Sequence, residues 1–220
     1  MKTNVDSKTA YLVQLALMVA VTILMSFTPL GYIRLPGLSM SLLSVPVAVA
    51  AILLGPIGGL VCGTTFGLTS LYQAITGGSA FTGTLLGLNP AGTVFLTVVA
   101  RALMGLCAGL IFAALHKNVK TQKISYYVTS LAAPLLNTIF FMSSLVLIFY
   151  RTDYIQGFVA KYASTNPLAF VIAFVGVQGL IEAVVCFIVA SAVGRILFGA
   201  VNKMGINYTL QKEEAAKAVQ

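Results

Sequence analysis

The stretch SLLSVPVAVAAILLGPIGGLVCGTTFGLTSLYQAI, residues 41–75, runs from end to end without a charged side chain. A helix that crosses a bilayer core needs about 20 apolar residues, and in lipid only helices and closed barrels satisfy every backbone polar group. Long continuous apolar runs are typical of helices, whereas an outer-membrane barrel shows short alternating segments. The stretch therefore predicts an all-α integral membrane protein.

The same depletion of charge extends outward from this stretch. Between Tyr11 and Leu115 the only charged side chains are Arg34 and Arg101, and 59% of the 220 residues are hydrophobic. Gly55 and Pro56 form a turn signal inside the apolar stretch, which either separates two spans or kinks one long helix. We predict six transmembrane helices, with uncharged or weakly charged loops at 30–40 and 76–90. The predicted spans are residues 10–28, 41–54, 57–75, 91–115, 125–150 and 167–198.

The basic residues orient these six spans. With the N-terminus in the cytoplasm, nine of the 13 Lys and Arg residues lie inside, Arg34, Arg151 and Lys161 lie outside, and Arg101 lies within a span. Positively charged loops are typical of the cytoplasmic side, so both termini are predicted to be cytoplasmic. The net charge of +8 is explained by this bias and gives no reason to expect nucleic-acid binding. We expect one membrane domain over residues 10–200, a cytoplasmic segment at 1–9 and a cytoplasmic polar tail at 201–220.

The sequence contains no motif of a known catalytic or nucleotide-hydrolysing site. It lacks Walker A, HExxH and GxSxG patterns, and its single histidine, His116, lies at a predicted span end. The three cysteines sit apart in apolar spans, so neither a metal site nor a cofactor is expected. The predicted spans hold one carboxylate, Glu182, and show no clear internal repeat, whereas secondary transporters are typically built from repeats. These features favour a binding subunit that takes its energy from a partner over an enzyme or a pump.

Polar groups at membrane depth mark candidate sites because burying them in lipid is costly. Glu182 lies in the middle of the last predicted span and shares a helix face with Gln178. Asn137 lies in the fifth span, and Arg101 lies in the outer half of the fourth. These residues either line a ligand cavity that opens to the outside, or Arg101 and Glu182 merely neutralise each other between helices.

Small residues four positions apart let membrane helices approach closely. Such pairs recur among the glycines of the third and fourth spans and at Ala16 and Ala20 in the first span. Most are expected to pack helices within the fold, whereas a pair on an outward face could dock another membrane subunit.

Several short blocks of sequence carry a resemblance to a known family. They are the pair Ala16 and Ala20, Pro36-Gly37, Ser44-Val45-Pro46, AILLGPIGG at 51–59, FGLTS at 66–70, Asn89-Pro90 followed by RALMG at 101–105, Asn137-Thr138 and Glu182-Ala183. Over roughly residues 10–200 the chain resembles the substrate-binding subunits, or S-components, of energy-coupling factor (ECF) vitamin transporters. The last two blocks are similar to those of the branch that includes pantothenate carriers.

The resemblance implies a multi-pass protein of a prokaryotic cell membrane that takes up a vitamin together with partner subunits. A vitamin would be captured from outside in a cavity formed by the first, third and fifth loops and the outer ends of the last three spans. Ala16 and Ala20 would dock on a transmembrane coupling subunit that works with two cytoplasmic ATPases. The subunit is then expected to topple in the membrane and release its cargo, without hydrolysing anything itself.

The sequence leaves the vitamin open. Pantothenate has a carboxylate that would need a cation such as Arg101 or Arg34, and an amide and two hydroxyls that would need neutral partners. Candidates for these partners are Tyr32, Asn89, Asn137 and Gln178. Cobalamin is the alternative, because the 20 glycines allow a wide pocket.

Two other classes of protein also remain open from the residues alone. One is an independent proton-coupled carrier with Glu182 as its proton site. The other is a membrane assembly factor that binds no ligand.

Overall fold

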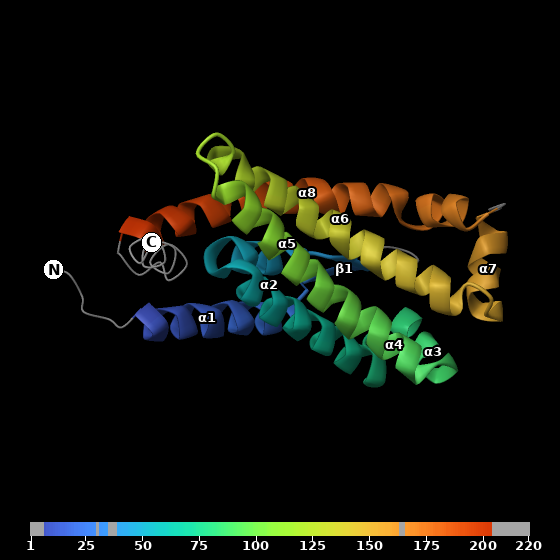
Figure 1. Ribbon diagram of the computed structural model, residues 1–220. Coiled ribbons are helices and arrows are strands. Elements are labelled where there is room, and N and C mark those ends of the chain that lie inside the picture. The colour runs from blue at the N-terminus through green and yellow to red at the C-terminus, as the bar shows by residue number, and fades with distance from the viewer. Residues whose placement is uncertain (1–6, 30, 35–38, 163–165, 204–220) are drawn as a thin grey trace.

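The computed structural model describes residues 7–29, 31–34, 39–162 and 166–203 (Figure 1). Within them, five helical segments are long and apolar enough to cross a membrane, and Pro167–Gly176 forms a shorter apolar stretch. The chain is therefore an all-helical membrane protein apart from one small hairpin. The long helices are α1 (Ser7–Phe27), α2 (Ser44–Ile75), α5 (Ala100–His116), α6 (Gln122–Phe149) and α8 (Pro167–Lys203).

Helix α2 contains a reversal of the chain at Gly55. Gly55 has φ 69° and ψ −158°, which are not helical angles, and glycine adopts positive φ at little cost. A methyl group placed on Gly59 would lie 3.2 Å from the Ala51 Cβ, whereas eight residues of straight helix rise about 12 Å. The segments on either side of Gly55 therefore fold back on each other, in agreement with the turn predicted at Gly55 and Pro56.

Glycines bring α2 and α5 into backbone contact. A methyl group on Gly59 would collide with the Gly105 carbonyl, one on Gly63 with the Arg101 carbonyl, and one on Gly109 with the Pro56 backbone. Positions rise along α2 as they fall along α5, so the two helices are antiparallel. The prediction that these glycines pack helices within the fold is confirmed.

Three regions outside the long helices differ from the sequence prediction. The expected loop at 30–40 contains a hairpin of β1 (Tyr32–Arg34) and β2 (Ser39–Ser41), with Tyr32 opposite Ser41. The prediction of a plain loop at 76–90 was wrong, because α3 (Ala80–Leu88) and the start of α4 (Pro90–Val94) lie there. Leu85 of α3 is fully buried, which gives this uncharged segment an apolar face to pack. A further helix, α7 (Asp153–Lys161), lies between α6 and α8.

The core has two parts at opposite ends of the molecule. One surrounds the first half of α2 and includes Leu43, Ile52, Phe66 and Met104. The other is rich in aromatic rings and joins α3, α6, α7 and α8. Figure 1 shows α3, α4 and α7 at the end of the bundle away from both termini, so this aromatic cluster closes the end that the charge distribution predicts to be extracellular.

Candidate binding cavity

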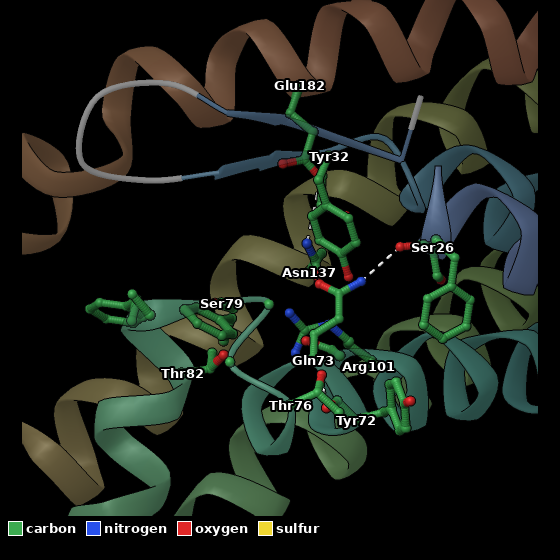
Figure 2. Close-up of a pocket in the computed structure, with 18 of the residues that line it drawn as sticks. Ser26, Tyr32, Tyr72, Gln73, Thr76, Ser79, Thr82, Arg101, Asn137 and Glu182 are labelled. Carbon is green, nitrogen blue, oxygen red and sulfur yellow. Dashed lines mark hydrogen bonds between the residues drawn. The ribbon is translucent and has the colours of Figure 1, made fainter. Parts of the chain in front are cut away.

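A cavity of about 1120 Å³ lies between the hairpin and the ends of the long helices. Its walls come from the hairpin, the last turn of α1, the C-terminal part of α2, the start of α3, the first turn of α5, and the interiors of α6 and α8. Figure 2 shows side chains from these elements converging on one space. The protein thus encloses a site large enough for a small molecule, in the half of the fold opposite the termini.

Arg101 supplies the positive charge of the cavity. Its side chain is 7% exposed, and Nη1 donates to the carbonyls of Leu96 at 3.3 Å and Thr97 at 3.1 Å. The guanidinium carbon lies 4.5 Å from the centre of the Phe66 ring and 5.2 Å from that of Phe141. The aromatic rings and carbonyls hold the group in place, whereas Nε has no hydrogen-bond partner.

The backbone before Arg101 is a π-helical turn, η1 (Phe95–Val99). Such turns are rare and are frequent at functional sites. Both carbonyls that accept from Arg101 belong to residues of this turn. The irregular backbone of the turn therefore helps to orient the guanidinium.

Glu182 supplies the negative charge from α8. It is 6% exposed, and Oε1 accepts from the Ser44 hydroxyl at 2.7 Å and, more weakly, from the Asn137 amide at 3.5 Å. Among the described residues no salt bridge joins Glu182 to Arg101. The two charges therefore form no direct ion pair, and each is hydrogen-bonded to other partners, although they still attract each other electrostatically.

Within the described part of the chain, four cavity-lining side chains each bury a polar atom without a hydrogen bond of good geometry, and the Ser70 hydroxyl is the neighbour of one of them, Tyr32. The four atoms are the Tyr32 hydroxyl, Thr82 Oγ1, Arg101 Nε and Asn137 Oδ1. Buried polar atoms are nearly always paired in folded proteins, so a group of four around one space indicates a polar ligand. Burial also raises the pKa of the Tyr32 phenol, which keeps this hydroxyl protonated and able to donate.

The structure brings four of the residues proposed from the sequence together: Tyr32, Arg101, Asn137 and Glu182 all line the cavity. Asn89 does not line it; its side chain caps α4 by accepting from the Gly92 amide at 2.9 Å. Arg34 lies in β1 and Gln178 in α8, but the side chains of both lie outside the described part of the structure.

Sequence reasoning also missed Ser26 and Gln73, which line the cavity, and Ser44 and Thr69, which lie behind its wall. Ser44 carries the hydrogen bond to Glu182, and the Gln73 amide donates to the Ser26 carbonyl at 2.7 Å, which ties the end of α2 to the end of α1. Ser26 also bonds Thr69 at 2.8 Å. Serine, threonine and glutamine are common in membrane helices, so only their shared position around the cavity marks them.

Helix α1 presents Ala16 and Ala20 on an exposed face. Leu12, Leu17 and Leu24 are also exposed on this helix. The two alanines therefore leave a shallow strip on an apolar surface, six or more residues before the first cavity residue of α1, Ser26.

Comparison with known families accounts for this architecture. Residues 10–194 match the family described as the substrate-specific component of ECF transporters. The chain belongs to this family. Substrate-specific components are membrane-embedded binding proteins of prokaryotic vitamin importers and not enzymes; they bind a substrate and associate with a transmembrane coupling subunit and ATPase subunits.

A named relative of this substrate-specific component is the pantothenate transporter PanT of Leuconostoc mesenteroides. It is 30% identical over 214 residues, which cover 91% of this chain and 98% of the relative. Membership of this family argues against the two other classes that the sequence left open, a proton-coupled carrier and a ligand-free assembly factor.

Proposed function

We propose that this chain captures pantothenate from outside the cell and delivers it to the coupling and ATPase subunits. The observation that carries the proposal is the set of four unpaired polar atoms around a cavity that holds both a buried arginine and a buried carboxylate. The name of the relative supports the same vitamin.

The carboxylate of pantothenate would bind Arg101. The guanidinium of this side chain lines the cavity and can donate to a carboxylate oxygen, and hydrogen bonds between two charged groups are the strongest available to a protein. Phe66 and Phe141 stack on the guanidinium and exclude water from it, which strengthens the attraction further.

The hydroxyls and the amide of pantothenate would bind at the wall formed by α6, α8 and the hairpin. The Glu182 carboxylate accepts hydrogen bonds, so it can receive the ligand hydroxyls. Asn137 Oδ1, which lacks a partner, can accept from the ligand amide, and the Tyr32 hydroxyl can donate to a carbonyl. The assignments of Tyr32 and Asn137 pair an unpaired buried atom with a complementary group of the vitamin, whereas Glu182 would accept from the ligand in addition to Ser44 and Asn137.

Cobalamin remains the second candidate for one reason. The cavity volume of about 1120 Å³ exceeds the roughly 300–1,000 Å³ of pockets for drug-sized ligands, so it offers more room than pantothenate needs. A nearly neutral ligand would nevertheless leave Arg101 without a charged partner, which favours pantothenate.

The chain reversal at Gly55 supports six membrane segments with both termini in the cytoplasm. Residues 56–75 are long enough for about 30 Å of helix, whereas residues 44–54 reach only about 16 Å. Because this second segment is short, the hairpin that precedes α2 would fill the outer half of the membrane above it. Ala16 and Ala20 on α1 would then dock on the coupling subunit.

Mass spectrometry of small molecules released from the purified protein tests the assignment of the vitamin. The protein is expressed in cells grown with pantothenate and cobalamin, purified in mild detergent and denatured. Release of pantothenate in near-stoichiometric amounts is expected. Release of cobalamin, or of another vitamin in place of pantothenate, would contradict the proposal.

A further inference from the structure

A second hollow lies on the flank of the bundle, away from the cavity described above. This groove has a volume of about 780 Å³ and lies between the first turns of α6 and the last turns of α8. Both helix ends belong to the side where the termini lie (Figure 1). Its lining residues are Tyr127, Ser191, Ala192, Arg195, Ile196, Gly199, Ala200 and Lys203.

The groove exists because α8 carries small side chains there. Its lining positions on α8 form two adjacent rows with a spacing of four residues, so they share one helix face. Ser191 and Gly199 flank Arg195 in the first row, and Ala192 and Ala200 flank Ile196 in the second. A methyl group on Gly199 would meet no atom within 4 Å, which confirms that this part of the groove is open.

Within the described part of the chain, two cations line the groove without a carboxylate beside them. Arg195 Nη1 donates to the Tyr127 hydroxyl at 3.1 Å, which orients the guanidinium across the gap between α6 and α8. Among the described residues the carboxylate side chains are Asp153 and Glu182, and neither lines this groove. The remaining donors of Arg195, together with Lys203, are suited to a phosphate group.

Apolar side chains surround this pair of cations. Ile196 is 70% exposed and Ile188 is 60% exposed, and both lie on α8 in the membrane-spanning region. A ligand with a phosphate head and hydrocarbon chains would fit the charged and apolar parts together. Basic pockets between helices at the cytoplasmic membrane surface recognise such lipids.

We propose that this groove binds one anionic phospholipid of the inner leaflet. Arg195 and Lys203 hold the phosphate, Tyr127 orients Arg195, and an acyl chain lies over Gly199, Ala200 and Ile196. The site would give the protein a preference for anionic lipid at one flank, independent of the vitamin in the cavity.

Native mass spectrometry of the purified full-length protein tests the proposal. The protein is titrated with phosphatidylglycerol and with phosphatidylcholine of the same acyl chains. We expect tighter binding of phosphatidylglycerol, and an Arg195→Gln, Lys203→Gln double variant should weaken that binding about thirtyfold, which corresponds to about 1 kcal/mol for each cation near the membrane surface. Gly199→Leu keeps both charges but fills the groove, and should weaken binding severalfold.

A matched control removes the same charge from the same side of the membrane. Lys117 and Lys120 are exposed in the turn between α5 and α6 and do not line the groove, so Lys117→Gln, Lys120→Gln should leave lipid binding unchanged. An equal loss of phosphatidylglycerol binding in this control would show that binding depends only on general surface charge, and it would overturn the proposal. Equal affinity for both lipids in the wild-type protein, or a preference that appears only after residues 204–220 are removed, would overturn it as well. Unfolding temperatures of all variants check that they remain folded.

Discussion

The guanidinium of Arg101 lines the cavity and is held in place by its own helix. Its Nη1 group satisfies two carbonyls of the π-helical turn, two aromatic rings cover its faces, and its Nε lacks a partner. Holding the charge in this way costs part of its hydration, which a bound carboxylate would offset. This arrangement supports the proposal that Arg101 binds an anion.

Replacement of Arg101 tests this arrangement at the level of one residue. We expect Arg101→Ala to weaken pantothenate binding about ten- to a hundredfold, since a hydrogen bond to a charged group contributes about 1.5–3 kcal/mol. Arg101→Lys should restore only part of the affinity because an ammonium lacks the planar fork of the guanidinium. Calorimetric titration of the three proteins measures the effect, and equal affinity in all three would remove Arg101 from the site.

Ser44 and Glu182 form a buried polar contact between α2 and α8. Ser44→Ala removes the 2.7 Å hydrogen bond to a buried carboxylate, so we expect the free energy of unfolding to fall by about 1.5–3 kcal/mol. Ser144→Ala is the matched control, because this buried serine bonds only to the Phe140 carbonyl of its own helix. Reversible unfolding in mixed micelles compares the two variants; similar losses in both would mean that the contact with Glu182 adds nothing.

At the scale of elements, the apolar helices could be predicted from the sequence and the segments between them could not. The lack of charged residues predicted the long helices, and the turn signal at Gly55 and Pro56 predicted the reversal in α2. The hairpin, α3 and α7 are short and depend on contacts with distant helices, as Leu85 of α3 shows by its full burial. No local pattern predicts such contacts.

Of the candidate site, the charged residues could be predicted from the sequence, but their hydrogen-bond partners could not. A lone charge inside a span is visible in the sequence, so Arg101 and Glu182 were identified. The pairing of Glu182 with Ser44 joins residues 138 positions apart, and it follows only from how α2 and α8 pack. Asn89 was proposed from the sequence as a partner for the neutral groups of the vitamin, but its side chain caps α4 by accepting from the Gly92 amide.

The glycine contacts between α2 and α5 give a prediction for a pair of helices. Gly105→Ala should destabilise the protein by about 1–3 kcal/mol, because the added methyl group collides with the Gly59 carbonyl and the helices must separate. Gly199→Ala is the control: its methyl group meets open space, and alanine favours a helix by about 1 kcal/mol over glycine. Thermal unfolding should rank the control at or above the wild type and Gly105→Ala below it; the reverse order would contradict the packing described here.

At the scale of the whole molecule, the cavity and the alanine strip of α1 occupy different parts of the fold. The cavity uses the C-terminal end of α1, from Ser26 onward, whereas Ala16 and Ala20 are exposed further toward the N-terminus. Capture of the vitamin and association with the coupling subunit can therefore be separated by mutation.

Ala16→Leu and Ala20→Leu should leave vitamin binding near normal and abolish uptake in cells that contain the complete transporter. A leucine on this exposed strip prevents close approach of a partner helix and touches no cavity residue. Binding to purified protein and uptake into cells are measured for the same variants, with Leu24→Ala, at an exposed position nearer the end of α1, as a comparison. Loss of both activities, or of neither, would remove the strip from the docking surface.

The central claim is that the isolated chain binds an anionic vitamin in the cavity around Arg101 and Glu182. Calorimetric titration of the purified, ligand-free protein with pantothenate, and in parallel with cobalamin, tests it most directly. Saturable binding of one pantothenate per chain, little or no heat with cobalamin, and a strong loss of affinity in Arg101→Ala are the predicted results. Tight binding of cobalamin, or binding of pantothenate that Arg101→Ala leaves unchanged, would contradict the claim.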